Sequence, residues 1–157
     1  IPVGVRAKEF DSVSICFSKG LGAPVGSALC FPADRIDEAR RARKLMGGGM
    51  RQSGILAAAA LYALENNADR LEEDHYHIEL LSAGLKNAGY KVRPSESNMV
   101  YFEAKNAGKL IETVKQDDVL GLALGPNTIR LVTHLQVSRK DIEQTIKSFT
   151  QHAAEHI

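Results

Sequence analysis

Two short apolar runs near the start of the chain predict two strands. Ser12–Phe17 is a β-branched and aromatic run after Asp11, and Gly26–Phe31 is a second run closed by Pro32. Neither run contains a charged residue, so we expect both strands to be buried. The connection over residues 18–24 carries two glycines and a proline, which predicts a tight turn.

Helical spacing follows these two strands. Asp34 is placed to cap a basic helix from about Arg35 to Met46, which would end at the Gly47–Gly49 triplet. A second helix is expected from about Arg51 to the Asn67 region. Its small apolar residues suit close packing against another element.

The composition becomes more polar after Asn67, and we place a domain boundary between residues 65 and 70. Beyond it, apolar periodicity predicts three helices and four strands. The helices are expected over Asp69–Ala88, over Lys105–Asp117 and from a Ser138 cap onwards, and the strands over Tyr90–Val92, Met99–Glu103, Leu120–Leu124 and Thr128–Thr133. This order indicates an α/β segment over residues 1–68 and a small α+β domain over residues 69–157.

Composition narrows the possible partners. The chain has 157 residues, of which 44% are hydrophobic, and its formal net charge is +1, which argues against nucleic acid as a partner. The longest uncharged stretches, Gly20–Ala33 and Gln52–Leu64, are shorter than the ~20 residues of a membrane span. Cys16 and Cys30 have no metal-binding spacing, so we expect buried reduced thiols.

The beginning of the chain does not read as a signal peptide. The first residue is Ile1, and Arg6 and Lys8 interrupt the apolar residues that follow it. We therefore expect the sequence to begin within a fold.

Lys19 is the strongest candidate for a catalytic residue in the sequence. It stands at the expected end of a strand, before Gly20 and Gly22, where backbone can approach a ligand closely. A lysine amine at such a place suits Schiff-base formation, for which its pKa must be lowered. The alternative interpretation of the same pattern is a solvated loop lysine without a catalytic role.

Other charged residues carry weaker signals. Arg51 follows the glycine triplet near a helix start, where anions are favoured, although these glycines could also simply end one helix. Asp74–His77 does not suit a metal, because residues two apart on a helix point in opposite directions. His134 is expected to be structural, and Arg40–Lys44 to form a solvated helix face.

Two long motifs resemble the low-specificity L-threonine aldolases. Residues 11–27 are similar to the lysine segment of that family, and residues 43–59 to its next motif, in the right order and at the right spacing. The likeness continues through residues 97–100 and 128–134. It implies a pyridoxal-phosphate-dependent enzyme of fold type I, with residues 1–68 as the end of the large domain and 69–157 as the small domain.

The resemblance also implies roles for individual residues. Lys19 matches the lysine that binds pyridoxal phosphate, and Arg130 the arginine that holds the substrate α-carboxylate, a group that guanidinium binds bidentately. Lys44 and Arg51 match residues near the cofactor phosphate and a subunit interface. In the family, the aspartate on the pyridinium nitrogen, the ring-stacking residue and the phosphate loop all precede the lysine.

The implied reaction is retro-aldol cleavage of L-threonine or L-allo-threonine to glycine and acetaldehyde, in glycine and amino-acid metabolism. The implied setting is a cytoplasmic homotetramer, a dimer of dimers, without nucleic-acid or membrane partners. A related β-eliminating lyase, an aminotransferase or a non-catalytic small-domain module are the alternatives.

Overall fold

The computed structural model describes residues 3–157, which fall into two compact units. The N-terminal unit reaches Asp69 and the C-terminal unit begins at Arg70. Ile1 and Pro2, where the sequence is expected to begin within a fold, lie outside the described residues. No helix among residues 3–157 is long and apolar enough to cross a membrane.

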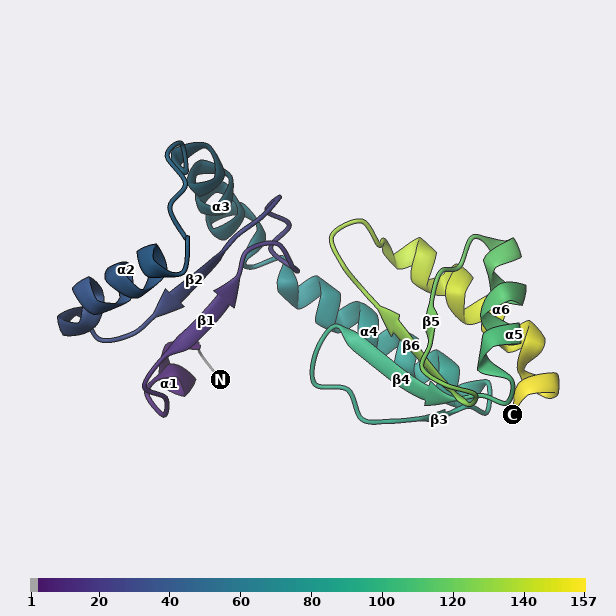
Figure 1. Cartoon of the computed structure of the whole chain (residues 1–157). Coiled ribbons are helices and arrows are strands. Elements are labelled where there is room, and N and C mark those ends of the chain that lie inside the picture. The colour runs from purple at the N-terminus through teal and green to yellow at the C-terminus, as the bar shows by residue number, and fades with distance from the viewer. Residues whose placement is uncertain (1–2) are drawn as a thin grey trace. The chain divides into compact units, whose positions relative to one another are not determined.

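The N-terminal unit is a hairpin with helices before and after it (Figure 1). Its elements are α1 (Val3–Ala7), β1 (Val13–Cys16), β2 (Ser27–Cys30), the 3-10 turn η1 (Ala33–Arg35), α2 (Ile36–Leu45) and α3 (Gly54–Asn67). The strands β1 and β2 pair antiparallel, with Val13 opposite Cys30 and Cys16 opposite Ser27. The two strands and two longer helices that the sequence predicts are confirmed, and α1 is an additional element.

The hairpin corrects the expectation of buried strands. Leu29 is 59% exposed, and both cysteines are exposed free thiols rather than buried ones. The apolar pattern is present, but the described residues cover these strands only in part: Val13 and Ile15 of β1 and Ala28 of β2 are half-buried, and no residue of either strand is fully buried. Asp34 is also not a cap: it lies within η1, and α2 starts after Arg35 without a side-chain cap.

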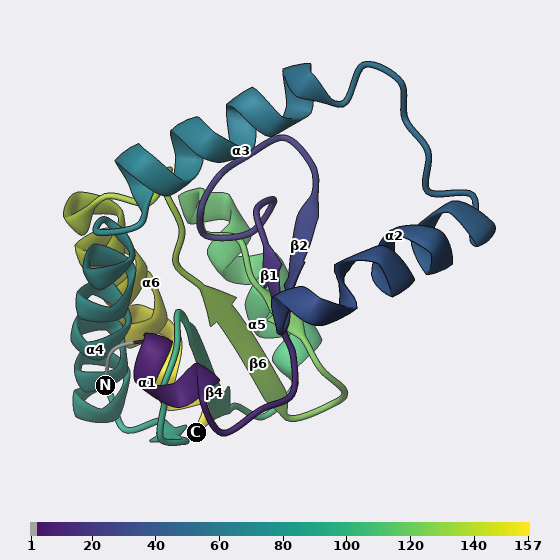
Figure 2. The same cartoon turned by 90° about the vertical axis from the view of Figure 1, so that its left-hand side faces the viewer.

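The C-terminal unit is a four-stranded antiparallel sheet with helices on one face (Figures 1 and 2). Its elements are α4 (Leu71–Asn87), β3 (Lys91–Val92), β4 (Met99–Glu103), α5 (Ala107–Val114), the 3-10 turn η2 (Lys115–Asp117), β5 (Leu122–Ala123), β6 (Thr128–Val132) and α6 (Arg139–His156). The sheet order is β3–β4–β6–β5. All of these elements were predicted, and β5 is shorter than expected.

Alternation along the two central strands creates the core of this unit. Val100 and Phe102 on β4, and Ile129 and Leu131 on β6, are buried, while the residues between them face the other side. The helices α4, α5 and α6 supply the opposing apolar side chains. At the start of α6, Ser138 and Asp141 form the capping box that makes the predicted Ser138 cap correct.

Candidate functional site

Lys19 lies in the turn that joins β1 and β2, and its side chain is exposed. The backbone oxygen of Lys19 accepts from the N–H of Gly22 at 2.8 Å, and Ala23 N–H donates to Phe17 at 2.9 Å. Gly22 has a φ of 74°, which a residue with a side chain rarely adopts. The turn therefore fixes the backbone of Lys19 and leaves its side-chain amine exposed to solvent.

The turn is fastened to the end of α3. Asn67 Nδ2 donates to the backbone oxygen of Leu21 at 2.7 Å, across a separation of 46 residues. Leu21 and Ala23 are buried, although most apolar residues of this unit are exposed. The turn that carries Lys19 is therefore one of the two buried parts of the N-terminal unit; the other is α3, where Ala60 and Ala63 are buried.

The glycine triplet ends α2 with a Schellman motif. Gly48 N–H donates to the oxygen of Arg43 at 2.8 Å, Gly47 N–H to that of Lys44 at 3.1 Å, and Gly47 has a φ of 83°. Gly49 N–H is also bonded, to the oxygen of Gly47. The triplet therefore offers no free N–H groups to an anion.

Lys44 and Arg51 flank this triplet and supply the positive charge of the segment. A Cβ on Gly49 would lie 2.8 Å from Lys44 Nζ, so the missing side chain leaves room for the amine. Arg51 is exposed and precedes the first residue of α3, Gly54, by three positions. Side-chain charge, rather than the glycine backbone, is what this segment can offer to a phosphate.

Arg130 lies in the middle of β6, on the face of the sheet opposite the helices. In the ladder it stands opposite Tyr101 of β4 and Leu122 of β5. Arg130 is partly buried, and its Nε is inaccessible and has no hydrogen-bond partner among the described residues. Because Nε is inaccessible, a carboxylate can bind Arg130 only through its terminal Nη groups, and a guanidinium binds this group through paired N–H donors.

The end of β6 next to Arg130 is held by paired polar groups. Thr133 N–H donates to the oxygen of Asn98 at 3.0 Å, and Asn98 Nδ2 donates to the oxygen of Thr133 at 2.7 Å. His134 is exposed, and its Nδ1 accepts from the Gln136 N–H at 3.3 Å. That bond makes Nδ1 an acceptor and leaves the proton of the neutral ring on Nε2.

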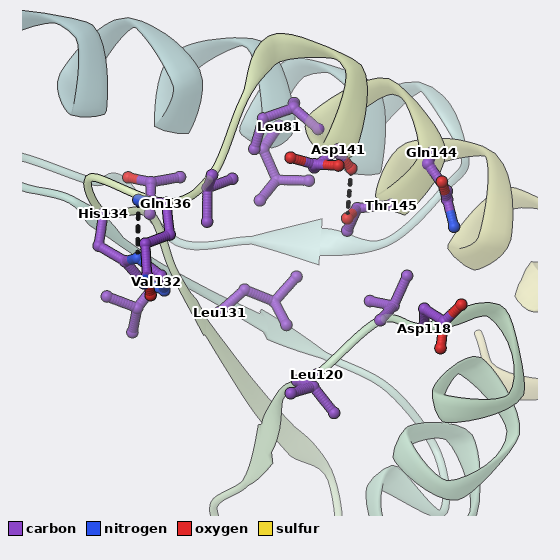
Figure 3. A pocket seen from close by; sticks show the side chains of 14 residues that line it. Leu81, Asp118, Leu120, Leu131, Val132, His134, Gln136, Asp141, Gln144 and Thr145 are labelled. Carbon is purple, nitrogen blue, oxygen red and sulfur yellow. Dashed lines mark hydrogen bonds between the residues drawn. The ribbon is translucent and has the colours of Figure 1, made fainter.

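A cavity of about 440 Å³ opens in the C-terminal unit beside this end of β6 (Figure 3). Leu131 points into it, while Asp118, Asp141 and Gln144 lie around its edge. Arg130 is not among its lining residues, whereas Leu131, Val132, Thr133 and His134 are. The cavity therefore opens around the end of β6, two residues beyond Arg130.

Within the Asp74–His77 segment of α4, Asp74 and His77 are buried, while His75 and Tyr76 are exposed. Arg70 Nη2 and Asp74 Oδ2 are 2.6 Å apart, and the Asp74 side chain is 1% exposed. His77 is equally buried, with its Nε2 3.9 Å from Glu73. Across residues 3–157, no three histidine, cysteine or acidic side chains are grouped as metal ligands would be.

The candidate residues divide between the two units. Lys19, Lys44 and Arg51 belong to the N-terminal unit, and Arg130 belongs to the C-terminal unit. The sequence did not reveal the Asn98–Thr133 pair or the bond from Thr133 to Asp74, because these contacts join residues far apart in the chain. The only available signal was that Asn98 and Thr133 both lie within the segments that resemble the family.

The residues that are present fit pyridoxal phosphate and its substrate at two points. The exposed amine of Lys19 on its hydrogen-bonded turn fits the cofactor carbonyl, and the partly buried guanidinium of Arg130 fits a carboxylate through its Nη groups. Burial raises the pKa of Tyr90 to about 12, but this hydroxyl donates to the backbone of Phe149 inside the core and serves packing.

Residues 2–107 match the family described as beta-eliminating lyase, which covers more than half of the chain. The chain therefore belongs to the beta-eliminating lyase family. It is 48% identical over 150 residues to the low specificity L-threonine aldolase of Escherichia coli K12, covering 92% of this chain and 44% of that protein. It is 38% identical to low-specificity L-threonine aldolase 1 of Arabidopsis thaliana, covering 96% of this chain and 44% of that protein.

Solved structures share the fold. The chain aligns with a threonine aldolase of Leishmania major at a TM-score of 0.80 and 22% identity, over 98% of this chain and 46% of that one. It aligns with a serine palmitoyltransferase of Sphingomonas wittichii at a TM-score of 0.77 and 20% identity, over 97% of this chain and 41% of that one. The predicted fold type I architecture and the resemblance to threonine aldolases are confirmed. The chain spans less than half the length of these relatives.

Proposed function

We propose that this chain supplies the cofactor lysine and the substrate-carboxylate arginine of a pyridoxal-phosphate-dependent lyase. The reaction is cleavage of L-threonine or L-allo-threonine to glycine and acetaldehyde. The observation that carries this proposal is the place of Lys19, exposed on a turn that Gly22 and Asn67 hold rigid. The likeness to threonine aldolases of two organisms supports it.

Each residue contributes by binding or orientation. Lys19 would hold pyridoxal phosphate through its Nζ amine. Arg130 binds the substrate carboxylate through two parallel N–H donors, which fixes the plane of the group. Lys44 and Arg51 neutralise the cofactor phosphate with their side-chain charge.

The chemistry at the reacting carbon needs an electron sink, which pyridoxal phosphate supplies when bound. The β-hydroxyl loses its proton as the Cα–Cβ bond breaks, and the released fragment leaves as acetaldehyde. The electron pair of that bond stays on the Cα side, which gains a proton to become glycine. Arg130 keeps the carboxylate in place throughout, so the Cα–Cβ bond keeps its alignment.

The assembly and location follow the same proposal. A homotetramer, as a dimer of dimers, would cover apolar side chains of the N-terminal unit that are exposed in this chain, such as Ile55 and Tyr62. The enzyme is placed in the cytoplasm, with an amino acid as its small-molecule substrate. Light scattering on the full-length protein tests the assembly.

The experiment for Lys19 uses the full-length protein loaded with pyridoxal phosphate. Borohydride reduction and peptide mapping should place the pyridoxyl group on Lys19, and Lys19→Ala should abolish both the label and glycine formation from threonine. Lys8→Ala, another exposed lysine of the same unit, is the matched control and should keep both. A label on Lys44 would contradict the assignment. Glycine formation without a keto acid separates the lyase from an aminotransferase.

A further inference from the structure

Thr133 ties the end of β6 to two other elements. The residue is 1% exposed, and its Oγ1 donates to the backbone oxygen of Asp74 in α4 at 2.9 Å. Its backbone N–H and oxygen both bond to Asn98, which immediately precedes β4. The Asn98 side-chain amide here takes the place of a backbone donor and extends the pairing of β4 with β6 by one residue.

The α4 end of this connection lies at the start of a well-packed helix. The buried carboxylate of Asp74 is held within α4 by Arg70, four residues earlier, at 2.6 Å. The helix is packed against the sheet through Ile78, Leu81 and Leu85, which belong to the core. The hydroxyl of Thr133 is therefore bonded to the first turn of a helix that the core holds in place.

The same strand carries Arg130 three residues earlier. Ile129, Leu131 and Thr133 are buried on the side of the helices, and Arg130 between them faces the other side. Side chains alternate strictly along a strand, so holding Thr133 inward also holds Arg130 outward. A guanidinium binds a carboxylate bidentately only in one plane, so the direction in which Arg130 is held bears on how tightly the substrate binds.

We propose that Thr133 is a positioning residue that sets the direction of the Arg130 guanidinium. The proposal rests on the proposed function of Arg130 in binding the substrate carboxylate. Thr133 acts through the strand: its hydroxyl bond to Asp74 and its pairing with Asn98 fix the end of β6, so the guanidinium meets the carboxylate in one orientation. Thr133 itself does not touch the substrate, because it faces the core.

Steady-state kinetics of full-length, cofactor-loaded variants test this role. Thr133→Val keeps the shape and removes the hydroxyl, and should raise KM for threonine roughly three- to tenfold while kcat changes less than about twofold. Thr133→Ser restores the hydroxyl and should restore KM. Thr150→Val is the matched control, because Thr150 bonds only within α6, to Ile146, and should leave KM unchanged.

A double variant distinguishes positioning from a general loss of stability. In an Arg130→Lys background, Thr133→Val should raise KM no further, because its effect passes through Arg130. An additional increase of the same size overturns the proposal, and so does an unchanged KM in Thr133→Val alone. An unchanged KM in Arg130→Lys instead overturns the proposed function of Arg130, and the positioning role with it.

A second variant approaches the same strand end from the opposite side. Asn98→Ala removes the 2.7 Å bond to the Thr133 oxygen and leaves Asp74 untouched. It should raise KM roughly threefold, and it decides the matter if Thr133→Val does not fold. An unchanged KM in a folded Asn98→Ala variant overturns the proposal.

Discussion

The helices α2 and α4 end in the same backbone motif, but the chain that follows them packs very differently. Each ends with a glycine of positive φ, 83° at Gly47 and 100° at Gly89, and each has both bonds of a Schellman motif. The residue after Gly89 is Tyr90, which is 3% exposed. The residue after Gly47 is Gly48, which has no side chain to bury.

Tyr90 shows what the C-terminal unit gains from this turn. Its ring lies 5.2 Å from that of Phe102 and 6.1 Å from that of Phe149, both in edge-on arrangements. In the N-terminal unit only Leu21, Ala23, Ala60 and Ala63 are buried apolar residues among those described. Identical local rules therefore build a helix end in both units, but only one unit surrounds it with a core.

The largest expected consequence concerns independent folding. Residues 70–157 expressed alone should unfold cooperatively, because the whole core cluster lies within them. Residues 1–69 alone should not, since their hairpin and helices expose apolar side chains. Circular dichroism melts and amide-proton dispersion measure both, and a cooperative melt of residues 1–69 would remove the contrast.

A core substitution should have the next largest effect. Phe149→Ala should destabilise the C-terminal unit by about 3–5 kcal/mol, because Phe149 is 0% exposed and contacts two other rings. Phe10→Ala is the matched control in the N-terminal unit, where Phe10 is 67% exposed, and should change stability by less than about 0.5 kcal/mol. Urea titrations give both values. Equal losses would show that the two units share one core.

Arg130 offers a substitution whose effect should appear in catalysis rather than in stability. Arg130→Lys should lower kcat/KM for threonine roughly 10²-fold, mainly through KM, because the bidentate contact is lost. Arg93→Lys, at an exposed position of the same unit, should change neither parameter. If both variants keep the original KM, Arg130 does not bind the substrate carboxylate.

The sequence predicted the C-terminal unit well because the signals there are local. The bounds of β4 at Met99–Glu103 follow from a short apolar and aromatic run, and the start of α6 follows from the capping chemistry of Ser138. It also predicted the hairpin strands and the lysine turn, where glycine spacing alone indicates a tight connection. These features depend on neighbours within about one helical turn or one strand.

The predictions that were wrong or missing share one physical cause, which is dependence on contacts that are not local in the sequence. The exposure of Cys16 and Leu29 depends on what covers the hairpin, and an apolar run carries no information about whether its cover is present. Asp34 has a side chain suited to an N-cap, but it lies within the 3-10 turn η1 rather than at the residue before a helix. The contacts of Thr133 join segments 59 and 35 residues away, which periodicity cannot reveal.

A glycine substitution sharpens the comparison of the two helix ends. Gly89→Ala should destabilise the C-terminal unit by about 1–2 kcal/mol, because an L residue at this φ is strained. A Cβ there would also lie 2.7 Å from Ile157 Cδ1, which must move aside. Gly47→Ala carries a similar strain but should leave the urea midpoint of this unit unchanged. A shift of that midpoint in Gly47→Ala would contradict the separation of the two units.

The smallest expected effect concerns the way helices begin. The helices α2 and α3 have no side-chain cap, whereas Ser138 caps α6 and its hydroxyl and backbone N–H both donate to Asp141. The Ser138 hydroxyl, and after it the backbone N–H, hold the pKa of Asp141 below its ordinary value. Because the pKa of Asp141 is lowered in the folded state, the bonds from Ser138 stabilise the fold at pH values above the unfolded pKa of about 4. This stabilisation is lost as the pH falls through the folded pKa.

Ser138→Ala should lower stability by about 1 kcal/mol at neutral pH, because the N-cap of α6 is lost. The difference in free energy of unfolding between Ser138→Ala and the original protein should narrow below about pH 4, because the Ser138 hydroxyl bonds less strongly to a protonated Asp141. Thr145→Ala, which removes a hydroxyl bonded within the same helix, is the matched control and should give a gap that does not depend on pH. Urea midpoints of residues 70–157 between pH 7 and about pH 3 measure these gaps. Parallel curves for Ser138→Ala and the original protein would show that the capping box does not lower the pKa of Asp141.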